Sequence, residues 1–361
     1  MPMTNPAFKR DMRISVVIEW ENARNVTAQR PRAMLAELRR QSRQLLRQPP
    51  SIAHSAEREF FSRLHPALEL IVVYDPCEVS ERALSMLLCE VLGTECDWIQ
   101  VRLLPCDDAQ YYRVKNAGAQ LATGGLVIFL DSDVIPESDW LSSLVGAFAD
   151  ERVSVMAGNA YIEPCSVFSK AFALGWFFPL RTHSKALVEA TGFFANNVAV
   201  RREYLAQFVF PQTPGAARGA CTMLARTLRD SGVTIYMHGG AWVKHPPPFG
   251  LSNFIVHALV QGRDGVYIGQ TIRHYEASHS AARGISMTAA EQPGALTRLG
   301  RSLGRHAGML SRIILKRSEV ALSWAEVPVA LGLMLFYFLV LYVGKALSLL
   351  FPGYMQRHFQ I

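Results

Sequence analysis

Leu126-Val127-Ile128-Phe129-Leu130-Asp131-Ser132-Asp133-Val134 is a run of five apolar residues that ends in two carboxylates. The apolar run predicts a strand buried on both faces, as in a parallel sheet. On extended backbone the side chains at positions i and i+2 project to the same side, so Asp131 and Asp133 could both face one divalent cation. The same residues also suit a turn or a helix cap, so the neighbouring sequence has to decide between the two interpretations.

Similar apolar runs recur on the N-terminal side of this stretch. Residues 13–18 (RISVVI) are followed by Glu19, and residues 68–74 (LELIVVY) are followed by Asp75. Residues 98–103 predict a further strand. Helical patterns lie between the strands, at residues 31–47, 55–64, 81–91 and 116–123. Alternating strands and helices with acids at strand ends predict a doubly wound α/β sheet that binds a nucleotide along one edge. Because the chain has no glycine-rich phosphate loop, a metal held by the acids would have to neutralise the phosphates.

Composition limits the class of protein. The chain has 361 residues, of which 50% are apolar and 19% charged, so it is neither disordered nor a multi-span membrane protein. The net charge of +7 favours anionic partners. Basic clusters with interleaved aromatic residues are absent, which favours a membrane over nucleic acid. The six cysteines form no CxxC pair and no zinc-finger spacing, so they predict small buried residues in a reducing compartment. We expect no cleavable signal in the first 13 residues, which lack an apolar run.

The C-terminal part of the sequence has a different character. Residues 327–344 are uncharged and almost wholly apolar, and the chain stays apolar from Lys345 to Phe351. This length predicts one transmembrane helix, with a buried core helix or a re-entrant segment as the alternative. Residues 295–317 carry leucines and arginines at helical spacing and predict an interfacial helix on anionic lipid, or else a basic helix packed on the preceding domain. The apolar segment predicts a single-pass membrane protein, and the positive charge predicts that the domain before it lies on the cytoplasmic side.

Several ordered motifs carry a resemblance to a known family. The runs ISVVI and ELIVVYD, then Lys115-Asn116-Ala117-Gly118-Ala119, and then ATGGLVIFLDSDVIPESDWL (122–141) resemble the family 2 glycosyltransferases, which have the GT-A fold. The resemblance covers about residues 13 to 248. It implies a metal-dependent inverting glycosyltransferase that moves a sugar from a nucleotide-sugar donor to a lipid or glycan acceptor at the membrane or cell envelope. The metal implied is Mg²⁺ or Mn²⁺.

The resemblance also implies a donor site. Glu19 and Asp75 would flank the base and ribose, Lys115 and Asn116 would lie near the phosphates or the sugar, and Asp131 would contact the donor diphosphate. The alternatives are that Glu19 and Asp75 cap helices and that Lys115 is a solvated helix residue. The family usually has a Pro-x-Tyr-Asn loop after the first strand, whereas this chain has Glu-Trp-Glu-Asn, which suggests altered recognition of the base or ribose.

The metal site implied by the resemblance consists of Asp131, Asp133 and the late His245. Neutral imidazole is a good metal ligand, although His245 precedes three prolines and could simply pack in a rigid loop.

The acceptor side is less well defined. The segment 191–202 is similar to the acceptor-side strand of the family and the basic pair after it, with a surface pair that binds nothing as the alternative. Arg218 and Lys244 could bind an acceptor phosphate. The acceptor-side candidates are therefore Asn196, Asn197, Arg201, Arg218 and Lys244.

One departure from the family pattern concerns catalysis. The family usually has an acidic pair at the start of the helix before the late histidine, and this chain has Ala220-Cys221 there. Neither residue is a plausible base for a sugar hydroxyl. Either another carboxylate serves, with Glu163 and Glu189 as weak candidates, or the acceptor is already ionised, or the protein is a non-catalytic GT-A scaffold that binds nucleotide or a partner enzyme.

We therefore expect an α/β GT-A fold, Rossmann-like with a mostly parallel sheet and flanking helices, followed by an interfacial helix and one transmembrane helix. The predicted layout is an N-terminal tail (1–12), the GT-A domain (13–250), a linker with basic amphipathic helices (251–320), the transmembrane helix (321–351) and a short tail (352–361).

Overall fold

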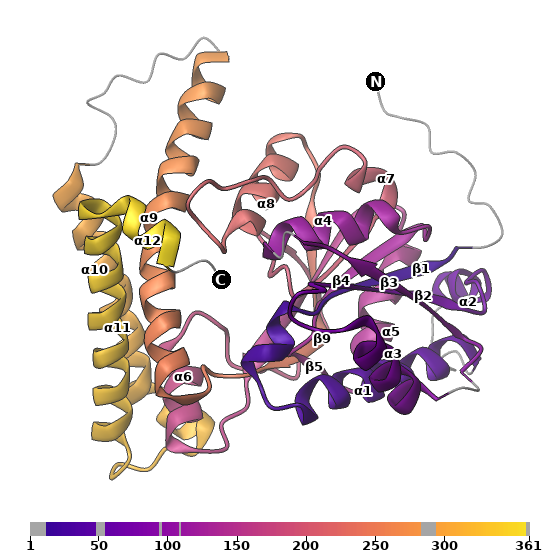
Figure 1. Cartoon of the computed structure of the whole chain (residues 1–361), viewed down its shortest axis with the longest axis horizontal. Coiled ribbons are helices and arrows are strands. Elements are labelled where there is room, and N and C mark those ends of the chain that lie inside the picture. The colour runs from indigo at the N-terminus through magenta and orange to yellow at the C-terminus, as the bar shows by residue number, and fades with distance from the viewer. Residues whose placement is uncertain (1–11, 48–54, 94–95, 108–109, 283–293, 359–361) are drawn as a thin grey trace. The chain divides into compact units, whose positions relative to one another are not determined.

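The structure is a computed structural model that describes residues 12–47, 55–93, 96–107, 110–282 and 294–358 (Figure 1). The chain divides into two compact units. Unit 1 comprises residues 1–160, 181–212 and 221–245, and unit 2 comprises residues 161–180, 213–220 and 246–361. The predicted boundary near residue 250 remains a prediction, and each unit is described by itself below.

Unit 1 is built on a sheet of nine strands in the described residues, in the order β3-β2-β1-β4-β8-β6-β9-β5, with β7 paired to β9. The strands are β1 (Ile14–Glu19), β2 (Leu68–Tyr74), β3 (Ile99–Pro105), β4 (Leu126–Asp131), β5 (Ile135–Pro136), β6 (Val155–Ile162), β7 (Leu187–Ala190), β8 (Asn197–Arg201) and β9 (Ile235–His245). Strands β1 to β4 pair in parallel, and β8 is antiparallel to β4. The four strands predicted from apolar runs are thus confirmed as the parallel half of the sheet.

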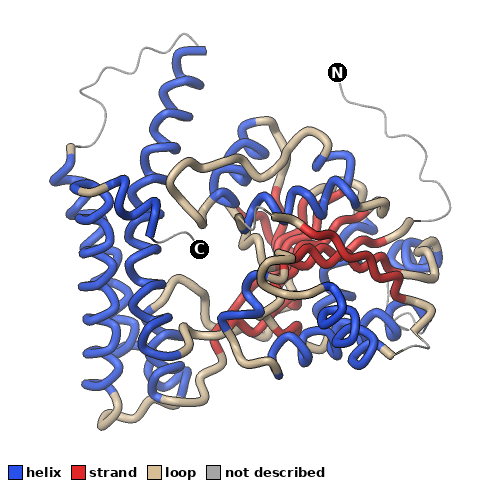
Figure 2. Tube along the Cα trace, in the orientation of Figure 1, coloured by secondary structure: helices blue, strands red, loops and turns tan. Residues whose placement is uncertain are grey.

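Helices cover both faces of this sheet. Figure 1 shows α4, α7 and α8 on one face and α1, α3 and α5 on the other, and Figure 2 shows the strands gathered between them. The helices of unit 1 are α1 (Gln29–Arg47), α2 (Ser55–Ser62), α3 (Glu81–Leu92), α4 (Tyr111–Leu121), α5 (Trp140–Gly146), α7 (Arg202–Leu205) and α8 (Ala220–Asp230). Short 3₁₀ turns are η1 (Glu21–Asn25) and η2 (Ala147–Ala149). With layers on both sides, β1, β2 and β4 are buried along their whole length, which explains their near-continuous apolar sequences.

A buried polar residue in β2 is compensated locally. Glu69 is 2% exposed, and its carboxylate accepts hydrogen bonds from the Ser15 hydroxyl at 2.5 Å, the Thr123 amide at 2.8 Å and the Arg102 guanidinium at 2.8 Å. These donors lower the pKa of Glu69 despite its burial, because each of them favours the charged carboxylate.

Asn197 connects the antiparallel half of the sheet to its surroundings. Its Oδ1 accepts a hydrogen bond from Trp140 Nε1 at 2.7 Å, and its Nδ2 donates to the carbonyls of Asn159 at 2.8 Å and Ala241 at 3.0 Å. A Cβ on Gly158 would lie 2.3 Å from the Asn197 amide, so the neighbouring strand has to be glycine there. The residue therefore joins β8, α5, β6 and β9 through one fully buried side chain.

Unit 2 is helical in its described residues. Its elements are α6 (Val167–Gly175), α9 (Gly250–Ala282), α10 (Ala295–Leu315), η4 (Arg317–Val320), α11 (Val327–Leu350) and α12 (Pro352–His358). Helices α9 and α11 approach each other closely at two glycines. A Cβ on Gly262 would lie 2.1 Å from the Leu341 carbonyl oxygen, and one on Gly344 would lie 2.2 Å from the Leu259 carbonyl oxygen.

Helix α9 is longer than the sequence predicted. The helical pattern covered residues 253–260, and 278–292 was predicted as a linker, but α9 continues to Ala282, and residues 283–292 lie outside the described part of the chain. Packing against α11 stabilises a helix whose own sequence has little amphipathic pattern, because tertiary contacts supply most helical stability.

Helix α11 is the one helix in the described residues that is long and apolar enough to cross a membrane. It has 24 residues and a mean hydropathy of 2.2 in its most apolar window, of which 39% is buried within the protein. The buried core helix of a soluble protein meets the same criteria of length and composition.

The hydrogen bonds of Asn197 predict a large stability effect. Asn197→Ala leaves the Trp140 indole and two carbonyls without this partner, so we expect the free energy of unfolding to fall by about 2–4 kcal/mol. Urea denaturation of the variant and of Gln207→Ala, a change at an exposed amide, measures the difference. Equal midpoints for the two variants would contradict the role assigned to Asn197.

Candidate functional site

The carboxyl ends of three parallel strands bring several predicted site residues together. The register sets Glu19, at the end of β1, level with both Asp131 of β4 and Val73 of β2. Asp75 follows β2 directly. Open α/β sheets bind ligands at this edge, because the strand ends and the loops after them face solvent there.

Asp131 is the centre of a buried hydrogen-bond network. Its Oδ1 accepts from Lys115 Nζ at 2.6 Å and from the Tyr111 hydroxyl at 2.9 Å, and its Oδ2 accepts from Tyr111 at 2.8 Å and Asn22 Nδ2 at 3.1 Å. Lys115 is 0% exposed and Asp131 is 3% exposed. Tyr111 and Lys115 lie one turn apart on α4 and reach the same carboxylate, which is the i, i+4 spacing of a helix face. Lys115 is thus a buried partner of Asp131 rather than a solvated helix residue.

Glu19 extends this network through Asn22. Its carboxylate accepts hydrogen bonds from the amide and side chain of Asn22, at 3.0 and 2.9 Å, and from the Ser132 amide at 3.4 Å. Burial raises the pKa of Glu19 well above its ordinary value, and the nearby charge of Asp131 raises it further. Sequence reasoning left open whether Glu19 contacts a ligand or caps a helix. Its bonds to Asn22, in η1, and to Ser132 favour a structural role.

Strand pairing joins the segments that contain Asp133 and His245. In the antiparallel pair of β5 and β9, Ile135 is level with Lys244, so extending the register by one residue sets His245 level with Val134, next to Asp133. Arg30, at the start of α1, holds the two segments together. Its Nε donates to the Asp133 carbonyl and its Nη2 donates to the Lys244 carbonyl at 2.7 Å. Nothing in the sequence near Arg30 indicated this role.

A cavity of about 230 Å³ lies beside Glu19, between the ends of β1 and β2. Trp20, Tyr74, Asp75 and Arg24 are among the residues that line it. Asp75 Oδ1 accepts a hydrogen bond from the Cys77 amide at 2.8 Å, which fixes the turn after β2. The structure thus brings Asp75 to the same edge as Asp131, in a cavity with aromatic walls.

The acceptor-side asparagines have different surroundings. The antiparallel pairing of Leu130 with Asn197 sets Asn196 level with Asp131. Asn196 is 6% exposed, and its Oδ1 accepts no hydrogen bond from any residue that the structure describes. Asn196 therefore lies at the candidate site with an available acceptor. The predicted acceptor-side role of Asn197 is not supported by its surroundings, because its amide is occupied inside the sheet by the three bonds given above.

The position of Arg201 does not support its predicted acceptor-side role either. It pairs with Leu126, at the opposite end of β4 from Asp131. Its guanidinium donates to the carbonyls of Val153 at 2.8 Å and Phe148 at 3.0 Å, and it is 6% exposed. Arg201 holds the sheet edge together and takes no part in the candidate site.

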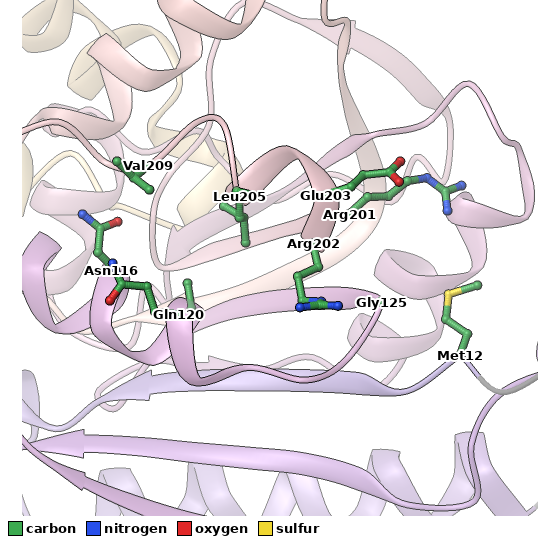
Figure 3. A pocket seen from close by; sticks show the side chains of 11 residues that line it. Met12, Asn116, Gln120, Gly125, Arg201, Arg202, Glu203, Leu205 and Val209 are labelled. Atoms are coloured by element: carbon green, nitrogen blue, oxygen red, sulfur yellow. The ribbon is translucent and has the colours of Figure 1, made fainter. Parts of the chain in front are cut away.

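Asn116 does not join the acids either. Its side chain bonds to both the amide and the carbonyl of Phe210, at 3.0 and 2.8 Å. It lines a second cavity, of about 450 Å³, at the Gly125 end of β4, where the side chain of Arg202 lies between Gly125 and Gln120 (Figure 3). This cavity is at the sheet edge opposite to Asp131, so the predicted donor contact of Asn116 is not supported by its position.

The start of α8 lies near the acids but carries no acid itself. Helix α8 begins at Ala220, as the resemblance implied. The Tyr112 hydroxyl donates to Cys221 Sγ at 3.4 Å, and the Tyr112 ring packs against Tyr111, with ring centroids 4.8 Å apart. Cys221 thus occupies the place of the family's acidic pair, one side chain away from the Asp131 network.

The remaining candidates have the following surroundings. Lys244 Nζ lies 3.8 Å from Glu137 Oε1. Glu189 is exposed on β7. Arg218 and Glu163 belong to unit 2, where the Arg218 amide donates to Asp264 Oδ2 at 2.8 Å. Within the described residues, no group of three or more His, Cys, Asp or Glu side chains is arranged to hold a metal ion by itself.

Comparisons with known proteins support the predicted class. Residues 63–208 match the family model described as Glycosyl transferase family 2. No curated protein matches the sequence. Among solved structures, the mannosyltransferase PcManGT from Pyrobaculum calidifontis, in complex with GDP-Man and Mn²⁺, aligns with a TM-score of 0.50 at 14% identity, over 93% of this chain and 87% of its own. GalNAc-T7 with UDP, GalNAc and Mn²⁺ aligns with a TM-score of 0.45 at 14% identity, over 82% of this chain and 54% of its own. The predicted fold class is confirmed.

The buried ion pair of Lys115 and Asp131 predicts a strong effect on stability. Lys115→Met leaves the Asp131 charge buried without its cation, so we expect the free energy of unfolding to fall by about 3–5 kcal/mol. Arg152→Met breaks an exposed pair with Asp150 and should cost far less, because solvent screens an exposed ion pair. Adding Asp131→Asn to Lys115→Met should restore part of the loss in urea denaturation. Similar losses for Lys115→Met and Arg152→Met would contradict this description of the site.

Proposed function

We propose that this chain, whose residues 63–208 match the glycosyl transferase family 2 model, transfers a sugar from a nucleotide-sugar, with inversion, to a membrane-associated lipid or glycan acceptor. The observation that carries this proposal is the arrangement along one edge of the sheet. The cavity, the Asp131 network and the two segments that contain Asp133 and His245 all lie at this edge. Together these features suit the base, the diphosphate and a metal of one donor molecule.

The donor would lie along this edge. The cavity lined by Trp20 and Tyr74 suits a flat base, because aromatic walls stack on it, and Asp75 would accept hydrogen bonds from the ribose hydroxyls. Asn196 Oδ1, buried and level with Asp131, offers an acceptor for a sugar hydroxyl. The proposal leaves Glu19 and Lys115 as supports of Asp131 rather than direct donor contacts.

The donor diphosphate is anionic, and the edge that would receive it is acidic. Glu19, Glu21, Asp131 and Asp133 are all buried there with Lys115. A divalent cation, Mg²⁺ or Mn²⁺, fits this excess of carboxylates, and the structurally similar PcManGT was solved with Mn²⁺. Asp133 and His245 are the ligands we assign, with the diphosphate completing the coordination. Asp131 has little acceptor capacity left after its bonds to Lys115, Tyr111 and Asn22, so we assign it a supporting role.

The chemistry of the chain's own residues follows from this arrangement. The metal would stabilise the departing nucleoside diphosphate as a Lewis acid. Lys115 and Tyr111 fix the direction of Asp131, and Arg30 fixes Asp133 relative to the segment that ends in His245. No carboxylate lies at the start of α8 to deprotonate an acceptor, so an acceptor that arrives as an anion would suit this site best.

We also propose that the protein acts at a membrane. The length and hydropathy of α11 and the arginines of α10 support the predicted lipid contact and a catalytic domain on the cytoplasmic side.

The metal assignment predicts a specific loss of binding. Asp133→Ala and His245→Ala should each weaken Mn²⁺-dependent binding of nucleoside diphosphates by tenfold or more, because each removes an assigned ligand. Isothermal titration with and without Mn²⁺ measures the effect. Asp139→Ala, at an exposed carboxylate paired with Lys185, should leave the affinity unchanged. Unchanged affinity in Asp133→Ala would refute the metal site.

The role of Arg30 predicts a smaller effect of the same kind. Arg30→Ala keeps both assigned ligands but frees the backbone of Asp133 and Lys244, so it should weaken Mn²⁺-dependent nucleotide binding by about 10- to 100-fold, the range for outer-shell partners of metal ligands. The matched control is Arg32→Ala. Arg32 lies on α1 like Arg30, and its substitution breaks an exposed pair with Glu90 of α3. If both variants bind like the wild type, Arg30 does not position the ligands.

The missing acid at the start of α8 favours one alternative, a scaffold that binds nucleotide without transfer. Purified full-length protein, incubated with a panel of nucleotide-sugars, Mn²⁺ and membrane extract, separates the two functions. Release of nucleoside diphosphate together with a glycosylated lipid or glycan supports transfer. Nucleotide binding without turnover of any donor supports the scaffold.

A further inference from the structure

We propose that α10 and α11 together form one flat apolar surface that lies in the plane of a membrane, so that α11 enters one leaflet without crossing the bilayer. The proposal rests on the membrane association proposed above and defines its geometry. It differs from the spanning arrangement that the length of α11 predicts.

Helix α11 has two distinct faces. The buried face packs within unit 2 through Ala330, Met334, Tyr337, Leu341 and Gly344. The opposite face is exposed and carries only apolar residues. Its large members are Val329, Leu335, Phe336, Leu339, Val343, Leu349 and Leu350, which are 44–70% exposed. An exposed apolar strip of 24 residues, about 36 Å long, needs a cover that is itself apolar.

Helix α10 lies antiparallel beside α11 (Figure 1). Its Ser302 hydroxyl accepts hydrogen bonds from Tyr342 at 3.2 Å and Lys345 at 2.8 Å. Its His306 ring stacks on Phe338 with centroids 4.4 Å apart, and Nδ1 lies 2.9 Å from the Tyr342 hydroxyl. These contacts define which side of each helix faces the other.

The apolar strips of the two helices point in the same direction. On α10, Leu303 follows the contact residue Ser302, and on α11, Leu339 follows the contact residue Phe338. Each leucine is therefore rotated by about 100° from the contact, in the same sense about the axis of its helix. Because the helices are antiparallel, these equal rotations bring Leu303 and Leu339 to the same side. Leu299 and Ile314, 47% and 43% exposed, extend the strip along α10. Two helices therefore share one apolar plane.

The arginines of α10 point away from this plane. Arg301 and Arg305 precede Ser302 and His306, so the same reasoning rotates them to the opposite side of the helix pair. Both are exposed. This distribution, apolar on one side and cationic on the other, is that of helices that lie at the lipid–water boundary with their charges at the level of anionic headgroups.

The position of Arg305 along the length of α11 argues against a transmembrane orientation of α11. His306 stacks on Phe338, which is the twelfth of the 24 residues of α11, so Arg305 lies level with the middle of that helix. If α11 crossed the bilayer, an exposed guanidinium would sit near the bilayer centre, which is costly. The buried Arg263–Asp264 ion pair on α9, one residue from Gly262 and its contact with Leu341, would also lie within the hydrocarbon. Both costs disappear when the helices lie flat.

The ends of the helix pair carry side chains suited to the boundary. Arg317 stacks on the exposed Trp324, with 4.1 Å from the guanidinium carbon to the ring centroid, at one end. Tyr354, 49% exposed, lies beyond the other end. Tryptophan and tyrosine are enriched where apolar and wet environments meet.

Labelling at both ends of α11 tests the geometry. In full-length protein with its native cysteines replaced, Ala325→Cys and Tyr354→Cys report the two ends, and Met86→Cys on α3 reports the side of unit 1. Membrane vesicles of known orientation from the expression host are treated with an impermeant maleimide. Flat insertion labels all three positions from the same side. Labelling of residues 325 and 354 from opposite sides would overturn the proposal.

Substitutions in the plane give a second test. Leu303→Glu and Leu339→Glu should each reduce the partition of the protein onto vesicles of anionic phospholipid by tenfold or more. Met86→Glu, at a residue 63% exposed on unit 1, should leave the partition unchanged. Mn²⁺-dependent nucleotide binding, which the three variants should retain, verifies their folding and tests the proposed function separately. If wild-type protein does not bind the vesicles, or if Leu303→Glu and Leu339→Glu bind like Met86→Glu, the apolar surface does not dock on a membrane.

Discussion

The buried ion pair between Lys115 and Asp131 is the interaction on which the site depends. A carboxylate at the end of a central strand, 3% exposed, is stable as an anion only when its charge is balanced and its lone pairs are used. Lys115 supplies the charge, and Tyr111 and Asn22 supply further hydrogen bonds. The pair therefore joins α4 to β4 at the carboxyl edge of the sheet, where β4 ends.

This constraint separates the roles of the two acids in Asp-Ser-Asp. The expectation that both face one cation assumed extended backbone through Asp133. Strand β4 ends at Asp131, and residues 132–133 form a turn, so the rule for positions i and i+2 no longer applies. The carboxylate of Asp131 is used within the protein, whereas Asp133 lies in a turn that Arg30 joins to the end of β9 through the carbonyls of Asp133 and Lys244.

Helix α11 shows how little an apolar run determines alone. Its hydropathy suits a spanning helix, an interfacial helix or a core helix equally well, because hydropathy counts residues without regard to their neighbours. In unit 2, α9 covers one side of α11 and α10 lies along another, which leaves one apolar strip uncovered. The arrangement of charge around that strip, rather than its length, distinguishes the three environments.

The sequence by itself determined the parallel strands, the acids at their ends, the start of α8 and the family resemblance, because buried runs and strand-end motifs are local patterns. Tertiary structure decided what each side chain does. Asn197 and Arg201 belong to the motif that resembles an acceptor site, yet their polar groups are used by carbonyls and an indole from distant segments. Arg30 carries no local signal and acts across more than 100 residues, on Asp133 and Lys244. Buried polar groups must find partners wherever the fold brings them, and those partners are fixed only when strands and helices far apart in the chain come together.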